Sequence, residues 1–137
     1  MLRFLFDTDH LTLYQHPPLM QRVTAQAGGV VGVSAVKAEE ALRGRLAALS
    51  RPLSGTARVR AYALLTDTIQ LLARLPMVPF DQSSESHFQR LRALRIRIGS
   101  QDLRIAALAL ANQLTLLTRN RRDFSRIPGL VIDDWSV

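Results

Sequence analysis

The sequence predicts an α/β domain of three layers, in which helices cover both faces of a central, mostly parallel sheet of four to five strands. Short apolar runs alternate along the chain with longer segments of helical periodicity, an order typical of parallel sheets covered by helices. Polar residues directly follow several of the apolar runs, as they do at the ligand-binding edge of such sheets. The chain has 137 residues, of which 47% are hydrophobic and 21% charged, so we expect one ordered domain over residues 1–137.

The first half of the chain contains two predicted strands and three helical segments. An apolar run followed by Asp-Thr-Asp indicates a strand that ends in a loop, and a β-branched run after two glycines is typical of a buried parallel strand. Ser34 is a plausible N-cap, because its hydroxyl can accept from the first turn of a helix. The predicted elements are a strand at Arg3–Phe6, a helical segment at 10–26 broken by Pro17 and Pro18, a strand at Val30–Val33, a helix from Ser34 to about Leu49 and a helix at Thr56–Leu75.

The second half contains three predicted strands and two helices. Prolines at 76 and 79 suit an edge strand, because proline cannot donate to a central ladder. We expect Ser83 or Ser84 to cap the first helix. The predicted elements are a strand at Met77–Phe80, a helix with an apolar face of Phe88, Leu91, Leu94 and Ile98, a helix at Gln101–Asn112 that buries Ile105, Ala106, Leu108 and Ala109, a strand at Leu114–Thr118 and a final strand at Leu130–Ile132.

The charge balance favours an acidic partner. The net charge is +7, and Lys37 is the only lysine, so the other basic residues are all arginines. A basic surface suits a polyanion such as nucleic acid. Heavy use of arginine and alanine also fits a GC-rich genome with no such role, so composition alone leaves both explanations open.

Composition also bears on the cellular compartment. The chain has no cysteine, and therefore neither a disulfide framework nor a thiolate zinc site. No apolar stretch approaches the roughly 20 residues needed to span a bilayer. The N-terminus enters a strand-like run directly and does not resemble a signal peptide. We therefore expect a cytoplasmic protein without a membrane partner.

Four polar residues far apart in sequence are the candidate active site. Asp7 ends the first strand, Glu40 follows the second, Asp102 opens a helix, and Asn120 follows the strand at Leu114–Thr118. Residues just beyond the carboxyl ends of parallel strands converge on one crevice. Oxygen ligands gathered there suit a hard divalent cation such as Mg²⁺ or Mn²⁺. The sequence therefore predicts a small metal-dependent enzyme.

Each of these residues also has a simpler explanation. Asp7 or Asp9 could be a helix N-cap. Asp102 lies in the first turn of its helix, where the helix dipole stabilises a carboxylate without any metal. Asn120 alone is an ordinary loop residue. The combination, rather than any single residue, supports a site.

Glu39 and Glu40 are adjacent on one predicted helix. Neighbouring helical residues point about 100° apart, so the two side chains cannot both face the site. We expect Glu40 to face the site and Glu39 to face solvent.

The motifs resemble those of PIN-domain nucleases, in order and at similar spacing from Leu2 to Trp135. Among these nucleases, a chain this short looks most like the VapC-type toxins of bacterial toxin–antitoxin pairs. The matching segments are Phe4–Asp9, Ser34–Gly44, Asp102–Ala107, Thr118–Phe124, Pro128–Leu130 and Asp134–Trp135. The resemblance implies a PIN-like fold and an endoribonuclease that hydrolyses RNA phosphodiester bonds.

The resemblance also implies roles for the site residues. Asp7 and Asp102 would be the main ligands of Mg²⁺ or Mn²⁺, with Glu40 as a ligand or as the base that positions water. Asn120 and Thr118 would contact these ligands rather than the metal ion itself.

Asn120 is a departure from the family, because many PIN nucleases have an acidic residue there. An amide oxygen can accept a hydrogen bond from metal-bound water but adds no charge. Asp9 or Asp123 could partly compensate, and the sequence leaves open whether one or two metal ions bind.

The implied partners are RNA, a cognate antitoxin protein and a second copy of the chain. Arg119, Arg121 and Arg122 flank Asn120, and such guanidinium groups suit a phosphodiester backbone. For protein partners, we expect an exposed apolar surface on the helices at 10–26 and 35–49.

Two other functions have to be weighed against the nuclease. Asp7-Thr8-Asp9 resembles the Asp-x-Asp of haloacid-dehalogenase phosphatases, but that chemistry needs a lysine late in the chain, where this sequence has none. The other alternative is a catalytically inactive PIN-like module that binds RNA or protein. Retention of three carboxylates argues against it.

Overall fold

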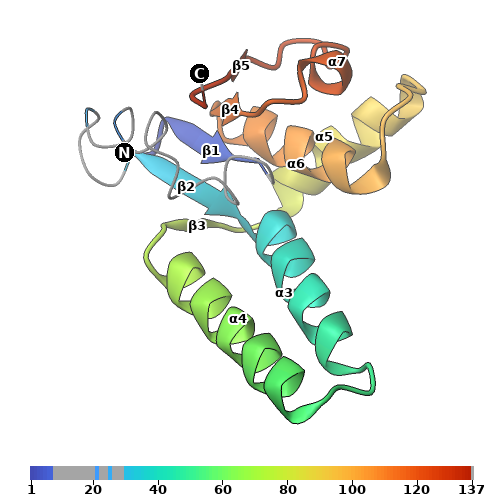
Figure 1. The fold of residues 1–137 in the computed structure, drawn as a ribbon. Coiled ribbons are helices and arrows are strands. Elements are labelled where there is room, and N and C mark those ends of the chain that lie inside the picture. The colour runs from blue at the N-terminus through green and yellow to red at the C-terminus, as the bar shows by residue number, and fades with distance from the viewer. Residues whose placement is uncertain (8–20, 22–24, 26–29, 137) are drawn as a thin grey trace.

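The computed structural model describes residues 1–7, 21, 25 and 30–136 of the chain. These residues form a five-stranded sheet and five helices (Figure 1). The strands are β1 (Phe4–Phe6), β2 (Val31–Ser34), β3 (Met77–Val78), β4 (Thr115–Leu117) and β5 (Ile132–Asp133). The helices are α3 (Ala35–Leu49), α4 (Gly55–Ala73), α5 (Gln82–Ala93), α6 (Ser100–Ala111) and α7 (Arg121–Phe124).

All strand pairs in the sheet are parallel, and the strand order is β3-β2-β1-β4-β5. β1 is central, with β2 on one side and β4 on the other. The chain first builds outward from β1 through β2 to β3 and then crosses to the opposite side at β4. This reversal makes the carboxyl ends of β1 and β4 the switch point, which is where such sheets bind ligands. The α/β fold class and the parallel sheet predicted from the sequence are confirmed.

The main hydrophobic core lies between one face of the sheet and helices α5 and α6. Leu5 of β1 and Leu116 of β4 are fully buried against the apolar side of α6, which includes Ile105 and Leu108. On the other face, Phe6 packs in a smaller cluster that contains Trp135. Alternate residues of the strands thus enter opposite layers, as the period of two in a strand requires. The buried side of α6 agrees with the prediction.

Helix α5 begins and ends at different residues from those predicted. Its N-cap is Asp81 rather than a serine, because the Asp81 carboxylate accepts from both the backbone N–H and the hydroxyl of Ser84. These two bonds lower the pKa of Asp81. Leu94 was expected on the buried face, but the helix ends at Ala93, and Leu94 is exposed in the following turn.

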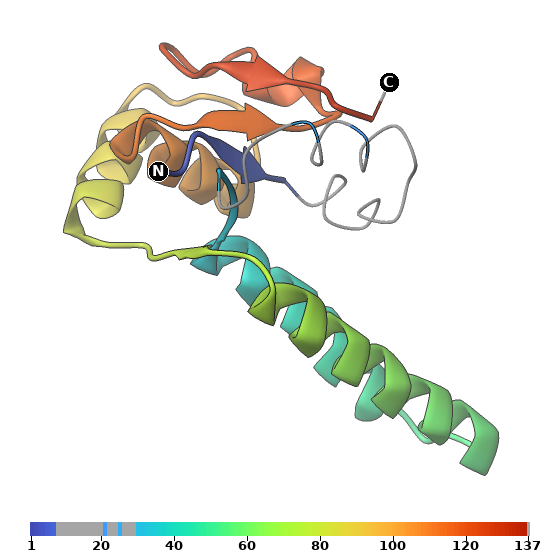
Figure 2. The same cartoon turned by 90° about the vertical axis from the view of Figure 1, so that its left-hand side faces the viewer.

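Helices α3 and α4 lie side by side as a hairpin that projects from the sheet (Figure 2). Only the end of this hairpin nearest the sheet packs into a buried cluster, through residues such as Ala38 and Leu72. Further along the hairpin, large apolar side chains stay exposed, namely Leu46, Val59, Tyr62 and Leu64, and Ile69 is exposed nearer the sheet. The predicted exposed apolar surface is thus on the hairpin, chiefly on α4 rather than α3. Residues 10–20, 22–24 and 26 of the other predicted surface lie outside the described residues.

Within the described part of the chain, no helix combines the length and the apolar character needed to cross a membrane.

Candidate active site

The centre of the candidate site is a pair of buried residues at the carboxyl ends of β1 and β4. Asp7 directly follows β1, and its backbone N–H donates to the carbonyl of Leu117 at 3.0 Å. Thr118 directly follows β4, and its hydroxyl donates to Oδ2 of Asp7 at 2.6 Å. The Asp7 residue is 4% exposed, and Thr118 is fully buried. The switch point of the sheet therefore holds a carboxylate away from water.

The second carboxylate oxygen of Asp7 is unusual because it is buried without a hydrogen bond from any described residue. Among the described residues, Oδ1 of Asp7 is a buried side-chain atom without a hydrogen-bond partner. Burying an ionised carboxylate is costly unless it is paired, hydrogen-bonded or bound to a metal. One oxygen is held by Thr118, and the other is a donor atom suited to a hard cation.

Helix α3 supplies the glutamate of the site from its first turns. The hydroxyl of Ser34 caps the helix by accepting from the backbone N–H of Lys37 at 2.9 Å, as predicted. Three residues later along α3, Oε2 of Glu40 pairs with the ammonium group of Lys37 at 3.3 Å. The Lys37 side chain is 3% exposed and that of Glu40 26%. The start of α3 therefore buries a cation beside one of the predicted catalytic carboxylates.

Glu39 points in a different direction from Glu40. Its side chain is 46% exposed and pairs with Arg43 one turn further along the helix. Its other oxygen accepts from the amide of Gln101 on α6 at 3.1 Å. The expected difference in orientation between the two glutamates is present, and the catalytic role of Glu40 stays a prediction.

Asp102 completes the predicted carboxylate set from the first turn of α6. Burial is the largest cause that raises its pKa, from an ordinary 3.8 to about 6, and the negative charges of Asp7, Glu40 and Asp123 add to the rise. The positive charge of Lys37 opposes it. Three carboxylates and one ammonium group, from the end of β1, α3 and α7, are therefore close enough to Asp102 to act on its charge.

Asn120 is the N-cap of the short helix α7. Its Oδ1 accepts from the backbone N–H of Asp123, and its Nδ2 donates to Oδ2 of Asp123 at 3.1 Å. Its own backbone N–H donates to the hydroxyl of Thr118 at 2.9 Å. Asn120 thus links Thr118, which holds Asp7, to Asp123, which contributes negative charge. Sequence reasoning placed Asp123 near the site but did not anticipate this chain of hydrogen bonds.

The predicted RNA-binding arginines lie at the edge of the site. Arg119, Arg121 and Arg122 are all exposed. Arg121 forms a long ion pair with Asp133, at 4.0 Å. Asp9, which was considered as an additional carboxylate, lies outside the described residues.

Lys37 is the functional-site residue that sequence reasoning missed. It is the single lysine of a chain rich in arginine, and this could have drawn attention to the position. A charged residue in a helix normally faces solvent, however, so its burial was not expected. Its position three residues before Glu40 places both side chains on one face of α3.

The carboxylate oxygens of the site suit a divalent cation chemically, although the side chains do not point toward one common position. Carboxylate oxygens from Asp7, Glu40, Asp102 and Asp123 match the preference of Mg²⁺ and Mn²⁺ for oxygen. Across the described residues, no three His, Cys, Asp or Glu side chains are arranged to hold one ion together. Glu40 pairs with the ammonium group of Lys37, and Asp7 accepts from the hydroxyl of Thr118. The unpartnered Oδ1 of Asp7 is the best evidence that a cation fits.

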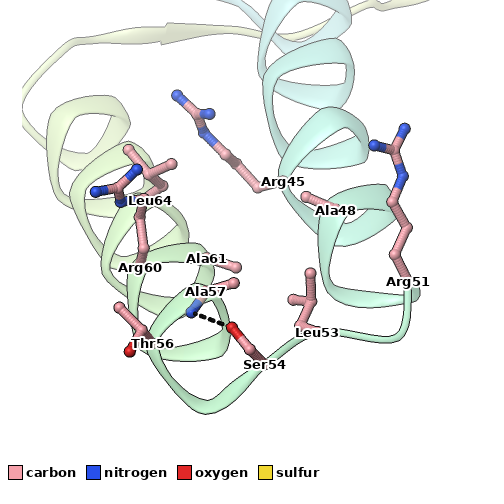
Figure 3. Close-up of a pocket in the computed structure, with 10 residues that line it drawn as sticks. All are labelled: Arg45, Ala48, Arg51, Leu53, Ser54, Thr56, Ala57, Arg60, Ala61 and Leu64. Atoms are coloured by element: carbon pink, nitrogen blue, oxygen red, sulfur yellow. Dashed lines mark hydrogen bonds between the residues drawn. The ribbon is translucent and has the colours of Figure 1, made fainter.

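A pocket lined by described residues is on the helical hairpin, away from these carboxylates (Figure 3). It has a volume of about 410 Å³. Arg45 extends from α3 into the space between the helices, and Arg60 and Leu64 line the pocket from α4 (Figure 3). Arg51 contributes a third guanidinium group at the end of α3, and no acidic residue is among the described residues that line the pocket.

Comparison with known proteins places the chain in a family. The family model of the PIN domain matches residues 13–130, and the chain therefore belongs to the PIN-domain family. This membership confirms the predicted resemblance and leaves the haloacid-dehalogenase alternative without support.

The chain is similar to VapC proteins. It is 35% identical over 68 residues to ribonuclease VapC2 of Rickettsia felis, a match that covers 47% of this chain and 51% of that protein. It is also 35% identical over 68 residues to the tRNA(fMet)-specific endonuclease VapC of Salmonella typhimurium, covering 47% of this chain and 52% of that protein. The matched region thus spans about half the length of these curated relatives.

Solved structures resemble the whole fold. The crystal structure of DNA-bound VapBC from Salmonella typhimurium superposes with a TM-score of 0.78 at 25% identity, covering 98% of this chain and 99% of that chain. The structure of VapBC2 from Rickettsia felis bound to a promoter DNA fragment gives a TM-score of 0.77 at 22% identity, covering 98% and 99%. The second likeness is evidence for the fold alone.

Proposed function

We propose that this protein is an endoribonuclease that depends on Mg²⁺ or Mn²⁺ and acts as the toxin of a toxin–antitoxin pair. One observation carries the proposal. Asp7 is buried at the switch point of a parallel sheet with one oxygen unpartnered among the described residues, and its charge, with those of Glu40 and Asp123, acts on Asp102. In a PIN-domain chain with VapC relatives, hydrolysis of RNA is the chemistry that best uses this arrangement.

Asp7 and Asp102 are the proposed metal ligands. Their carboxylates enter the site from β1 and α6, and their mutual repulsion favours a bound cation. A bound divalent ion supplies a nucleophilic water at neutral pH and offsets the charge that develops on the phosphate oxygens.

Glu40 is the proposed base or third ligand. It is partly exposed at the mouth of the site, so its carboxylate can accept a proton from the attacking water. Thr118 orients Asp7 by donating to Oδ2, which would leave Oδ1 to hold a cation. Asn120 orients Asp123 in the same manner, by donating from Nδ2.

RNA is the proposed substrate because the rim of the site is basic. The net charge of +7 attracts a polyanion. Arg119, Arg121 and Arg122 are exposed beside Asn120 and can pair with backbone phosphates. Such contacts position the strand without selecting a sequence, so the RNA that is cut does not follow from these residues.

The proposed protein partners are an antitoxin and a second copy of the chain. The solved structures of similar fold include DNA-bound VapBC from Salmonella typhimurium and a toxin–antitoxin complex from Klebsiella pneumoniae. The exposed apolar residues of the hairpin, among them Tyr62 and Ile69, offer a surface for such contacts. Light scattering that detects only monomer over a wide concentration range would contradict the homodimer.

The test of the enzyme proposal is cleavage of RNA by the purified chain. Total RNA should be cut in the presence of Mg²⁺ or Mn²⁺, and excess EDTA should stop the reaction. Cleavage that continues unchanged in EDTA would overturn the metal mechanism. Re-addition of Mn²⁺ after chelation should restore cleavage, which excludes irreversible unfolding as the cause.

A binding module without catalytic activity is the alternative. The ion pair between Lys37 and Glu40 favours it, because a base engaged with an ammonium group is not free to activate water. Absence of cleavage for every RNA tested, together with retained RNA binding, would select this alternative.

A further inference from the structure

Lys37 has an environment unlike that of any other basic residue described in the chain. The other basic residues are all arginines, and the one lysine is 3% exposed. Its ammonium group is 3.3 Å from Oε2 of Glu40. A buried ammonium group loses its hydration and is retained only where nearby negative charge compensates for that loss.

The compensating charge at Lys37 is the carboxylate set itself. Glu40 contacts it directly from the same helix, and the charge of Lys37 also acts on Asp102 of α6. Asp102 is in turn affected by Asp7 and Asp123. Lys37 is therefore the positive member of a group of five charges contributed by β1, α3, α6 and α7.

We propose that Lys37 is a built-in counter-charge of this site, which holds Glu40 in place and limits the RNA-free site to one tightly bound divalent ion. The inference rests on the proposed metal-dependent function and adds a residue to it. Lys37 is a positioning residue here, because it acts on the reaction through Glu40 and through the charge of the site.

The chemistry of lysine fits this position better than that of arginine. An ammonium group is a compact point charge with three donors, whereas a guanidinium group is planar and broad. A compact charge on the face of α3 can lie next to Glu40 without occupying the space in front of Asp7 and Asp102. A chain that otherwise uses arginine for every basic residue has a lysine where this geometry is required.

The charge count gives the consequence for metal binding. The four carboxylates of Asp7, Glu40, Asp102 and Asp123 would attract two divalent ions if nothing opposed them. One internal positive charge reduces that attraction, so a second ion should bind only when substrate phosphate adds negative oxygen atoms.

The test compares two substitutions that each remove one positive charge from α3. Lys37→Met replaces the buried ammonium group by an apolar side chain of similar length. Arg43→Met removes the exposed partner of Glu39 and is the matched control. Mn²⁺ is titrated calorimetrically into each full-length protein, and the melting temperature of each is measured with and without Mn²⁺.

Lys37→Met should bind Mn²⁺ at least about fivefold more tightly than the parent chain, or should gain a second site, because the cation no longer meets a neighbouring positive charge. Without metal it should melt at a lower temperature, since the carboxylates lose their counter-charge. Mn²⁺ should then raise its melting temperature by more than it raises that of the parent, because tighter binding stabilises more. Arg43→Met should change none of these quantities appreciably.

The outcomes separate this inference from the proposed function. If the parent binds Mn²⁺ and Lys37→Met binds it with the same affinity and stoichiometry, the counter-charge role is wrong and the nuclease proposal is unaffected. If the parent binds no Mn²⁺, the metal-dependent function and the metal part of this inference both fail. The remaining claim is then that Lys37 compensates the charge of the carboxylates, and the melting temperature without metal tests it. A lower melting temperature for Lys37→Met than for the parent would support this claim, and an equal one would overturn it.

A spectroscopic measurement covers the possibility that Lys37→Met does not fold. The parent protein labelled with ¹⁵N-lysine has one side-chain Nζ signal, because the chain has one lysine. Substoichiometric Mn²⁺ should broaden this signal strongly, since a paramagnetic ion in the site lies near the ammonium group. A signal that stays sharp while Mn²⁺ is bound would contradict the proposal.

Discussion

The two ends of helix α3 place charged side chains in opposite surroundings. At its beginning, the buried Lys37 pairs with the partly buried Glu40, and both charges act on Asp102 of α6. At its far end, Arg45 and Arg51 line an open pocket on the projecting hairpin (Figure 3). A charge that is withdrawn from water interacts strongly with its neighbours, whereas an exposed charge is screened by solvent and salt. This difference is one reason why we propose the buried end of α3 as part of the reaction centre.

The pocket on the hairpin does not mark the proposed chemistry. Among the described residues, the lining of the hairpin pocket has basic, apolar and small polar side chains and no carboxylate. The carboxylate site instead contains Oδ1 of Asp7, which is unpartnered among the described residues, and the raised pKa of Asp102. Perturbed titratable groups are the stronger indicator of a reaction centre.

The largest expected effect comes from the glutamate pair on α3. Glu40→Gln should lower the rate of RNA cleavage by about a hundredfold or more, because the amide cannot accept a proton from water. Glu39→Gln removes the same charge from the exposed side of the helix and should leave the rate largely intact. Single-turnover cleavage of one defined RNA measures both. The reverse pattern would mean that α3 is rotated relative to the site.

The next effect concerns two threonines, one at the carboxylate site and one on the hairpin, whose hydroxyls hydrogen-bond polar groups. Thr118→Val deprives both Asp7 and the Asn120 backbone of a buried hydrogen-bond partner, so it should lower the free energy of unfolding by roughly 2–4 kcal/mol. Thr68→Val on the hairpin loses bonds to Arg45 and to the carbonyl of Leu64 in a more open setting and should cost less than about 1 kcal/mol. Urea denaturation compares the two. Equal losses would contradict the energetic difference between the regions.

The pH dependence should be specific to the buried site. Because the folded-state pKa of Asp102 is raised from 3.8 to about 6, the native metal-free protein retains a proton that the unfolded chain has released. Its contribution to stability is therefore present below the unfolded pKa and is lost as the pH rises through about 6.

Metal binding should have the opposite slope, since it requires the ionised carboxylate. Mn²⁺ affinity should increase as the pH rises through about 6 and then level off. Calorimetric titration across this range measures it, and the exposed Asp67→Asn variant, altered on the hairpin, should give the same curve as the parent. An affinity that is flat across the range would contradict the raised pKa.

The smallest effect is expected for the exposed arginines. Replacing Arg119 and Arg122 by glutamine should weaken RNA binding severalfold and reduce its dependence on salt, with a slope change of about 0.7 for each phosphate that is no longer neutralised. Replacing Arg51 and Arg60 on the hairpin removes the same charge at a distance from the carboxylates and should weaken binding less. Fluorescence anisotropy at several salt concentrations compares the two pairs. A larger effect from the hairpin pair would place the RNA along the hairpin.

The elements of the sheet could be predicted because their signals are local. The apolar runs that became β1, β2 and β4 are short, are followed by polar residues and are separated by helical periods. The residues at their carboxyl ends were identified for the same reason, since the topology of a parallel sheet brings such positions together. The cap of α5 was predicted at the wrong residue because Asp81 and the serines after it are all good N-cap residues, and only the tertiary structure selects one.

The relations between elements could not be predicted from local sequence. The burial of Lys37 depends on α6 and β1 lying opposite the start of α3, and a lysine in a helix is otherwise expected at the surface. The bond from Asn120 to Asp123 depends on the turn after β4. The hairpin projects because few of its residues pack against the sheet. The periodicity of apolar residues in α3 and α4 does not show how many of them will do so.

The measurement that tests the central claim most directly is Mn²⁺ binding to the parent chain and to Asp7→Asn. The proposed site predicts that the parent binds Mn²⁺ and that Asp7→Asn, which removes the charge next to the unpartnered buried oxygen, loses that binding and RNA cleavage together. Asp67→Asn should keep both, because its side chain is exposed on the hairpin. Binding of Mn²⁺ to Asp7→Asn with the parent's affinity would contradict the assignment of the site to the carboxyl end of β1.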